Sequence, residues 1–157
     1  MAGTTRARLL DELSTVSRRT MASYALFNQA VADHLGLHPT DLQCLNLLTL
    51  EGGPVTTGRI AELTGLTTGS ATRLVDRLEK AGYVVRDRDT ADRRRVLVVT
   101  VPEKAAEFGR LWEQLGDGFS ALFDDLDDAQ LALIVDHMRR TADFCAGQVA
   151  RLRAGDV

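Results

Sequence analysis

The stretch TTGSATRLVDRLEKAGYVVRDRDTADRRRVLVV, residues 67–99, decides the fold. Its first half repeats apolar side chains with the period of an amphipathic helix, at Ala71, Leu74, Val75 and Leu78. Thr67 can cap the first turn with its side-chain oxygen, and Gly82 stands where helices commonly end in a left-handed residue. The start signal at Thr67, the end signal at Gly82 and the apolar spacing agree with one another. The sequence therefore predicts a helix over residues 67–82 with its apolar stripe against a core.

The outward face of this predicted helix is polar. Small or polar residues follow the same helical spacing on another face, at Gly69, Thr72, Arg73 and Asp76. A helix of this kind fits the major groove of DNA, where arginine and hydroxyl side chains can bond to base edges. The residues of this segment that we expect to contact DNA are Thr67, Thr68, Gly69, Ser70, Thr72, Arg73 and Arg77.

A second, shorter helix is predicted upstream, over residues 57–63, with Thr56 as its cap. Its inward candidates are Ile60, Ala61 and Leu63, and residues 64–66 then turn the chain. Two helices joined by a short Gly-containing turn, the second with the polar outward face, form the helix-turn-helix pattern. The pair alone would equally fit a helical hairpin inside any all-α domain, so the segment that follows has to distinguish the two.

Two β-rich runs follow Gly82, over residues 83–86 and 96–99, and the aspartates between them favour a turn over residues 89–93. A charge run often marks only a solvated face. Beside a recognition-type helix, however, arginines on a projecting turn fit DNA phosphates or the minor groove. The residues of this hairpin, or wing, that we expect to contact DNA are Arg86, Arg93, Arg94 and Arg95.

Together these residues resemble the multiple antibiotic resistance regulator (MarR) family of winged-helix transcription factors. The resemblance covers about residues 39–104, and residues 67–82 look like the family's recognition helix, with the arrangement Arg-Leu-Val-Asp-Arg-Leu at 73–78. The wing signature is matched at Arg86, Asp89, Asp92, Arg93 and Arg94. The resemblance implies that Asp92 stabilises the wing and that Arg94 enters the minor groove.

Two positions depart from the family's pattern, and neither lies on the expected DNA-contacting surface. Val101 replaces the usual capping threonine after the wing, so we expect the next helix to begin with Pro102 in its first turn or with Thr100 as a shifted cap. Arg59 stands three residues after Thr56, where a capping box would have a glutamate. A cation at a helix N-terminus is unfavourable unless it meets an anion such as phosphate, so Arg59 favours a DNA role.

The net charge of −3, from 19 Lys and Arg against 22 Asp and Glu, by itself argues against DNA binding. Residues 56–95 contain nine basic and six acidic side chains, a sum of +3, whereas the remainder has ten against sixteen, a sum of −6. Basic charge is therefore concentrated in the winged segment. We expect the acidic flanks to disfavour wrapping of DNA around the rest of the chain.

Other classes of protein find little support in the sequence. No stretch approaches the roughly 18 apolar residues of a membrane span and no signal peptide is visible, so we expect a cytoplasmic protein. No Gly-rich phosphate loop or nucleophile–base pair is visible either, so we expect no enzyme and no cofactor. A winged helix used only for protein contact is the alternative, but it would expose apolar residues where this chain has Thr68, Thr72 and Arg73.

The cysteines and histidines lack the spacing of a metal site or a redox sensor. Cys44 lies among leucines on the helix before the motif and Cys145 lies on the last helix, and we expect each to be a small buried residue. The histidines are scattered, which favours surface or capping positions over metal ligation. They are His34, His38 and His137.

The segments that flank residues 39–101 are long, helical and apolar, which makes the predicted fold mainly α with a small β-hairpin wing. Asp127 with Gln130 forms a capping-box-like start for the last helix. The fifth helix is expected to carry Phe108, Leu111, Trp112, Leu115, Phe119, Leu122 and Phe123. Because the winged lobe is too small to cover these helices, we expect residues 1–38 and 102–157 to pair with a second copy in a twofold homodimer. A monomer that folds them back on itself is the alternative.

Such a dimer would place two recognition helices against the halves of a pseudo-palindrome about one DNA turn, roughly 34 Å, apart. In the family, small aromatic ligands bind where the dimerisation helices meet the winged lobe. The resemblance therefore implies a regulator, here a repressor, that a small aromatic effector releases from DNA. Candidate pocket residues, each of which also fits an ordinary core, are Tyr24, Phe27, Leu45, Leu48 and Trp112.

Overall fold

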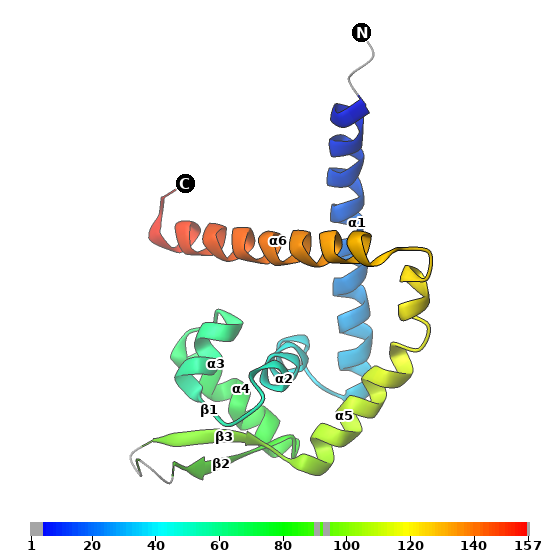
Figure 1. The fold of residues 1–157 in the computed structure, drawn as a ribbon. Coiled ribbons are helices and arrows are strands. Elements are labelled where there is room, and N and C mark those ends of the chain that lie inside the picture. Colours follow the sequence, from blue (N-terminus) through cyan, green and yellow to red (C-terminus); the bar gives the residue numbers. More distant parts are fainter. Residues whose placement is uncertain (1–4, 90–91, 93–94, 157) are drawn as a thin grey trace. The chain divides into compact units, whose positions relative to one another are not determined.

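A computed structural model describes residues 5–89, 92 and 95–156. The elements in chain order are α1 (Thr5–Leu35), α2 (Pro39–Glu51), β1 (Val55–Thr56), α3 (Thr57–Thr64), α4 (Thr68–Lys80), β2 (Val84–Arg88), β3 (Val96–Thr100), α5 (Pro102–Leu115), the 3₁₀ turn η1 (Ser120–Phe123) and α6 (Asp128–Ala154) (Figure 1). The prediction of a mainly α chain with a β wing is confirmed. The chain forms two compact units, residues 1–108 and 109–157. The functional division at residues 38 and 102 stays a prediction.

The core of the first unit lies where α4 packs against α2, α3 and the start of the sheet. All four residues of the predicted stripe, Ala71, Leu74, Val75 and Leu78, are fully buried. Ile60 of α3 is fully buried as predicted, whereas Ala61 and Leu63 are partly exposed. The polar face of α4 is thereby fixed outward, which is what a recognition helix needs.

The predicted helix ends are also present. Thr56 Oγ1 accepts a hydrogen bond from the Arg59 amide at 3.1 Å, and Thr67 Oγ1 accepts one from the Ser70 amide at 3.3 Å. Gly65 and Gly82 adopt the left-handed backbone expected after α3 and α4, with φ of +71° and +78°. Gly65 at the end of α3 and Thr67 at the start of α4 thus cap both helix ends that the turn joins.

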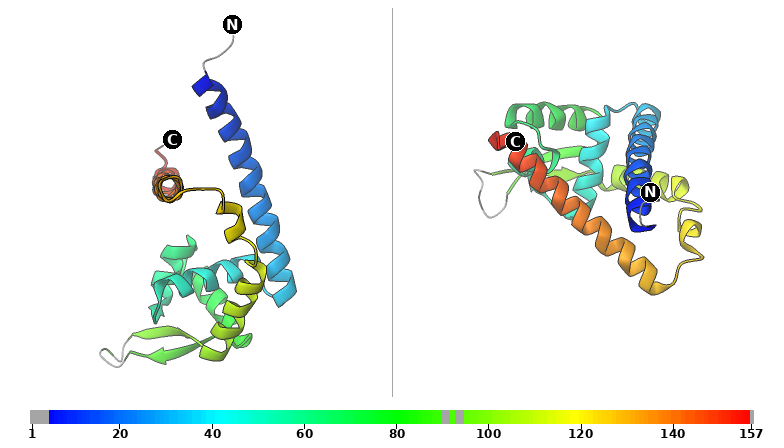
Figure 2. Two further views of the ribbon diagram at one scale, coloured as in Figure 1. Left: turned by 45° about the vertical axis from the view of Figure 1, so that its right-hand side comes forward. Right: turned by 90° about the horizontal axis from the view of Figure 1, so that it is seen from above.

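The wing is a three-stranded antiparallel sheet in the order β1-β3-β2, and its hairpin projects from the helices (Figure 2). Val84 pairs with Thr100 and Arg88 with Val96, so the hairpin predicted from the sequence is confirmed. The short strand β1 was not predicted, because two residues are too few for a period-two pattern. It pairs Val55 with Val98 and so attaches β3, the central strand of the sheet, to the start of α3.

The helix after the wing differs from its prediction at one end. It begins at Pro102 as expected, but it ends at Leu115, so the expectation of one helix through Phe123 is wrong. A Cβ on Gly116 would lie 2.9 Å from the Trp112 carbonyl oxygen, and Gly118 has φ of +82°. Two glycines within three residues thus end α5 and separate Phe119, Leu122 and Phe123 from it.

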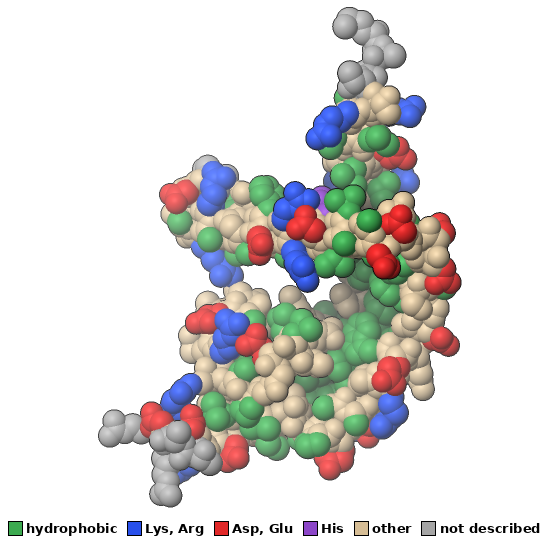
Figure 3. Space-filling model, viewed as in Figure 1, with side chains coloured by type: hydrophobic (Ala, Val, Ile, Leu, Met, Phe, Trp, Pro, Cys, Tyr) green, Lys and Arg blue, Asp and Glu red, His purple; other side chains and the backbone are tan. Residues whose placement is uncertain are grey.

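The long terminal helices leave most of their apolar side chains exposed within the single chain. α6 begins with the predicted capping box, in which Asp127 and Gln130 exchange two hydrogen bonds of 2.8 Å. No residue of α6 is buried, and apolar side chains are visible among its charges in Figure 3. The large apolar residues of α6 that are exposed are Leu133, Val135, Met138, Phe144, Val149 and Leu152. In α1 only Val31 and Ala32 are buried.

The two cysteines lie in opposite environments. Cys44 is buried as expected, whereas Cys145 is exposed, so the prediction of a buried Cys145 is wrong for the single chain because α6 has no buried residue. Burial and then the nearby Asp41 carboxylate raise the pKa of the Cys44 thiol from 9.0 to about 12. The folded state therefore holds this proton more tightly, and the resulting stabilisation is lost as the pH rises from 9.0 toward about 12.

We expect Cys44 to be inert toward thiol reagents in the folded protein, because the thiolate is the reactive form. In a Cys145→Ser variant at pH 8, Ellman's reagent should detect one thiol only after the chain is unfolded in denaturant. The parent protein, with Cys145 accessible, serves as the control. Rapid reaction of the folded variant at the rate of a free cysteine would contradict the buried environment.

Candidate DNA-binding surface

The outward face of α4 presents its small and hydroxyl side chains without obstruction. Thr67, Thr68, Gly69 and Thr72 are exposed, and Ser70 is partly exposed. A Cβ placed on Gly69 would meet no atom within 4 Å, so the backbone at this turn is open to an approaching molecule. The Thr72 hydroxyl donates to the Thr68 carbonyl at 2.9 Å, and its oxygen can still accept a hydrogen bond.

Arg73 is the best-presented cation of this face. Its Nη2 donates to Ser70 Oγ at 3.2 Å, and Ser70 Oγ is also 3.1 Å from Thr67 Oγ1. The cap residue, the serine and the arginine thus form one line of hydrogen bonds along α4. Among the described residues Arg73 has no ion pair with a carboxylate, so most of its five N–H donors remain available.

Arg77, which the sequence predicts as a DNA contact, has a partner within the protein. Its Nε and Nη2 donate to the two carboxylate oxygens of Asp41 in α2, at 2.8 and 2.5 Å. The Asp41 side chain is 2% exposed, whereas that of Arg77 is 50% exposed and covers it. The hydrogen bond to Asp41 raises the pKa of Arg77 above its ordinary value. Sequence reasoning missed Asp41, since it lies 36 residues from Arg77.

Arg86, which the sequence predicts as a DNA contact, also has partners within the protein. Its guanidinium pairs with Asp76 at 2.6 Å and with Glu79, and its amide donates to Glu79 Oε1 at 3.2 Å. Both acids belong to α4 and Arg86 belongs to β2, so these bonds attach the wing to the recognition helix. The single positive charge of Arg86 also offsets part of the negative charge of these two acids, which would otherwise repel DNA more strongly.

The turn of the wing is closed by Asp89 and Arg95. The Asp89 amide donates to the Arg95 carbonyl at 3.1 Å, and the two side chains form an ion pair of 3.6 Å. The Asp92 carbonyl accepts from the Arg95 amide at 2.9 Å, while the wing-stabilising role predicted for its side chain stays a prediction. Arg93 and Arg94, two of the predicted DNA contacts, lie outside the described residues.

Arg59 at the start of α3 is explained without DNA. Its Nε and Nη2 donate to the two Glu51 carboxylate oxygens at 3.0 and 3.1 Å, and its Nη1 lies 3.2 Å from Glu62. These carboxylates offset the unfavourable helix dipole, so the cation needs no phosphate. The expectation that Arg59 favours a DNA role therefore loses its basis.

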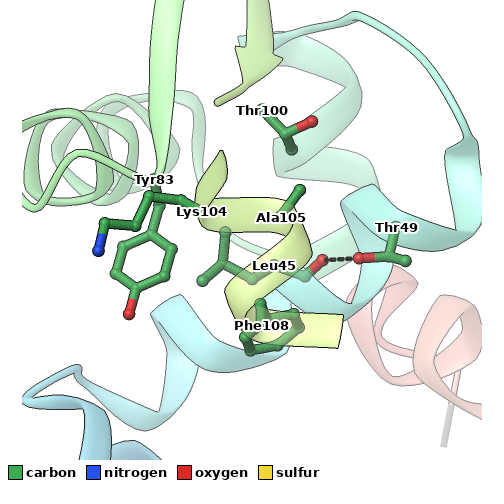
Figure 4. A pocket seen from close by; sticks show the side chains of 7 residues that line it. All are labelled: Leu45, Thr49, Tyr83, Thr100, Lys104, Ala105 and Phe108. Carbon is green, nitrogen blue, oxygen red and sulfur yellow. Dashed lines mark hydrogen bonds between the residues drawn. The ribbon is translucent and has the colours of Figure 1, made fainter. Parts of the chain in front are cut away.

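Of the candidate effector residues, Leu45 lines a small hollow of the first unit, and an effector site stays a prediction. This hollow lies between α2, the base of the wing and the start of α5, and is lined by Leu45, Thr49, Tyr83, Thr100, Lys104, Ala105 and Phe108 (Figure 4). Leu45 is the predicted residue that lines it, whereas Leu48 is in the core and Tyr24 and Phe27 are exposed on α1. The hollow has room for about one water molecule, which is too little for an aromatic ligand.

Within residues 5–89, 92 and 95–156, no three His, Cys, Asp or Glu side chains are grouped so that they could hold a metal ion. His38 is a helix cap, as expected for one of the histidines, and its Nδ1 accepts from the Thr40 amide at 3.2 Å. Over the same part of the chain, no helix combines the length and apolar character needed to cross a membrane.

The amino-acid sequence is similar to a known protein family and to known regulators. A family model described as the MarR family matches residues 35–95. The chain is 38% identical over 148 residues to the uncharacterized HTH-type transcriptional regulator YcgE of Bacillus subtilis (strain 168), with 94% of this chain and 96% of that protein covered. It is 27% identical over 130 residues to YkoM of the same organism, a second uncharacterized HTH-type transcriptional regulator, with 74% and 84% covered.

Solved structures share the fold. A MarR family protein from Bacillus stearothermophilus superposes with a TM-score of 0.69 at 21% identity, covering 89% of this chain and 97% of that one. A MarR family transcriptional regulator from Silicibacter pomeroyi has a TM-score of 0.67 at 22% identity, with 88% and 93% covered. With a relative 38% identical over nearly its whole length and a matching family model across the winged segment, the chain belongs to the MarR family of transcriptional regulators.

Proposed function

We propose that the protein is a sequence-specific regulator that binds double-stranded DNA as a homodimer and acts as a repressor in the cytoplasm. The observation that carries the proposal is the presentation of Arg73 on the outward face of α4. Arg73 is exposed and hydrogen-bonded to Ser70, while the two acids of the same helix, Asp76 and Glu79, are paired with Arg86. An arginine in this setting is suited to a bidentate contact with a guanine edge.

The homodimer is supported by the apolar side chains of α1 and α6. Leu9, Leu10, Leu13 and Val16 of α1 are each about half exposed, and the six large apolar residues of α6 are 44% to 65% exposed. Apolar surface of this extent is costly in water and is typical of an interface between subunits. A twofold pair would also supply the second recognition helix that a pseudo-palindromic operator requires.

Selection of bound fragments from random DNA tests the proposal. The purified chain should enrich a pseudo-palindrome whose half-sites lie about 10 base pairs, or one turn, apart. This duplex is the operator. Enrichment of no motif, with binding as weak as to random DNA, would contradict the proposal and favour a winged helix that contacts protein.

Release by a small aromatic effector is proposed from membership of the family. By linkage, a ligand that weakens operator binding must bind the free protein more tightly than the DNA-bound protein, by the same factor. Calorimetric titration of both forms with a phenolic carboxylate such as salicylate would compare the two affinities. Equal affinities would exclude release by that compound.

Substitution of Arg73 tests which residue recognises bases. We expect Arg73→Ala to lower operator affinity by about 1 to 3 kcal/mol and to change affinity for random DNA much less, because a base contact contributes only at the correct sequence. Arg95→Ala, which removes an exposed cation of the wing, is the control and should weaken both affinities together. Full discrimination by Arg73→Ala in fluorescence anisotropy would show that the recognition helix meets DNA in another register.

A further inference from the structure

The recognition helix is joined to α2 by an ion pair whose acid is buried. Asp41 is the buried charged residue of the described chain, and both of its carboxylate oxygens accept hydrogen bonds from Arg77. The pair links the first turn of α2 to the last turns of α4. Burying an acid costs free energy unless the acid is fully paired. The contact between Asp41 and Arg77 therefore has a structural role that apolar packing alone does not provide.

The apolar stripe of α4 and the ion pair constrain the helix differently. Apolar contact is non-directional, and it determines which face of α4 is inward. The fork of Arg77 on the Asp41 carboxylate is directional, because two parallel N–H···O bonds require a coplanar approach at a set distance. It therefore fixes how far α4 is rotated and shifted along its own axis over α2.

The position of Arg73 depends on that rotation and shift. Arg73 lies four residues before Arg77, one helical turn away on neighbouring surface of α4. Hydrogen bonds to base edges weaken steeply when distance or angle departs from the optimum. Contacts with DNA phosphates tolerate such a change better, because they depend mainly on charge.

We propose that Asp41 is a positioning residue for sequence recognition, which holds α4 through Arg77 in the register where Arg73 meets its bases. The inference rests on the proposed DNA-binding function and goes beyond it, since it assigns specificity to a residue that does not touch DNA. It also assigns Arg77 to the interior contact and not to a phosphate.

The test compares operator and random-sequence duplexes by fluorescence anisotropy at one salt concentration and 25 °C, after circular dichroism has shown that each protein is folded. The variants are Asp41→Asn, which keeps the shape of the acid without its charge, and Arg77→Lys, which keeps the charge without the fork. Glu51→Gln is the matched control. It removes an acid from the same helix and breaks an arginine pair, but that pair leads to α3 and not to α4.

We expect Asp41→Asn and Arg77→Lys each to lower the ratio of operator to random-DNA affinity about tenfold, with random-DNA affinity changed less than about twofold. Glu51→Gln should leave the ratio unchanged. If Asp41→Asn is unfolded at 25 °C, Arg77→Lys decides the question, because its side chain is half exposed and its charge still meets the buried acid.

Two results would overturn the inference. An unchanged ratio with a lower melting temperature would show that the pair only stabilises the fold. A rise in both affinities on Asp41→Asn would show that Arg77 is a phosphate contact released by the substitution. A parent protein without preference for the operator would instead refute the proposed function, and with it this inference, before any variant is compared.

Discussion

Leu74→Ala should destabilise the winged lobe by about 2 to 5 kcal/mol, which is a large part of the stability of a small domain. Leu74 is fully buried on the inward face of α4, with Leu42, Ile60, Leu78 and Val84 also fully buried in the same core. Removing three side-chain carbons there loses transfer free energy and leaves a cavity that rigid neighbours only partly fill. Operator binding should fall with it, because the outward face of α4 exists only while the inward face is packed.

Val85→Ala provides the matched control for this prediction. Val85 lies on the wing and is 46% exposed, so its truncation should change stability by no more than about 0.5 kcal/mol. Urea unfolding followed by circular dichroism, at one protein concentration for all variants, gives the comparison. Equal midpoints for Leu74→Ala and Val85→Ala would mean that α4 does not pack on this stripe.

What could be predicted from the sequence is what short segments determine by themselves. The stripe at Leu74 and Leu78 and the caps at Thr56 and Thr67 each depend on residues within one or two helical turns, and all of them are present. The hairpin was likewise predicted because its strands are neighbours in sequence. The third strand was not, because β1 is defined only by its pairing with β3, more than 40 residues later.

The ion pairs show the same limit at the candidate site. Arg77 and Arg86 are predicted DNA contacts, but their acidic partners within the protein could not be predicted from spacing. Asp41 is 36 residues from Arg77 and lies on another helix. Because a cation on a recognition helix can meet either a phosphate or a buried acid, residue type alone did not distinguish a DNA contact from a positioning contact. The exposure of Cys145 was missed for a related reason, since an apolar stripe predicts burial without saying which molecule covers it.

The largest change in DNA binding is expected when the surface that a second copy would cover is removed. Deletion of residues 142–157 removes Phe144, Val149 and Leu152, which are exposed apolar residues of α6 in the single chain. If these residues pack against a second copy, the truncated chain should sediment as a monomer at concentrations where the full chain is a dimer. The recognition helix and wing lie in the other compact unit, so the truncated chain should keep a folded lobe.

The truncated chain should then lose most of its affinity for the operator, because a single half-site must bind without the second half tethered to it. We expect its dissociation constant to approach the non-specific range, roughly 10⁻⁴ to 10⁻⁶ M at physiological salt. A double substitution of the exposed ion pair on α6, Asp136→Ala with Arg140→Ala, changes the same helix without removing apolar surface and should leave both dimer and affinity intact. Sedimentation of the three proteins with and without operator separates the possibilities. A full-length chain that is monomeric at micromolar concentration and still binds one operator tightly would disprove the dimer, because a lone recognition helix would then suffice for the specificity that two were proposed to supply.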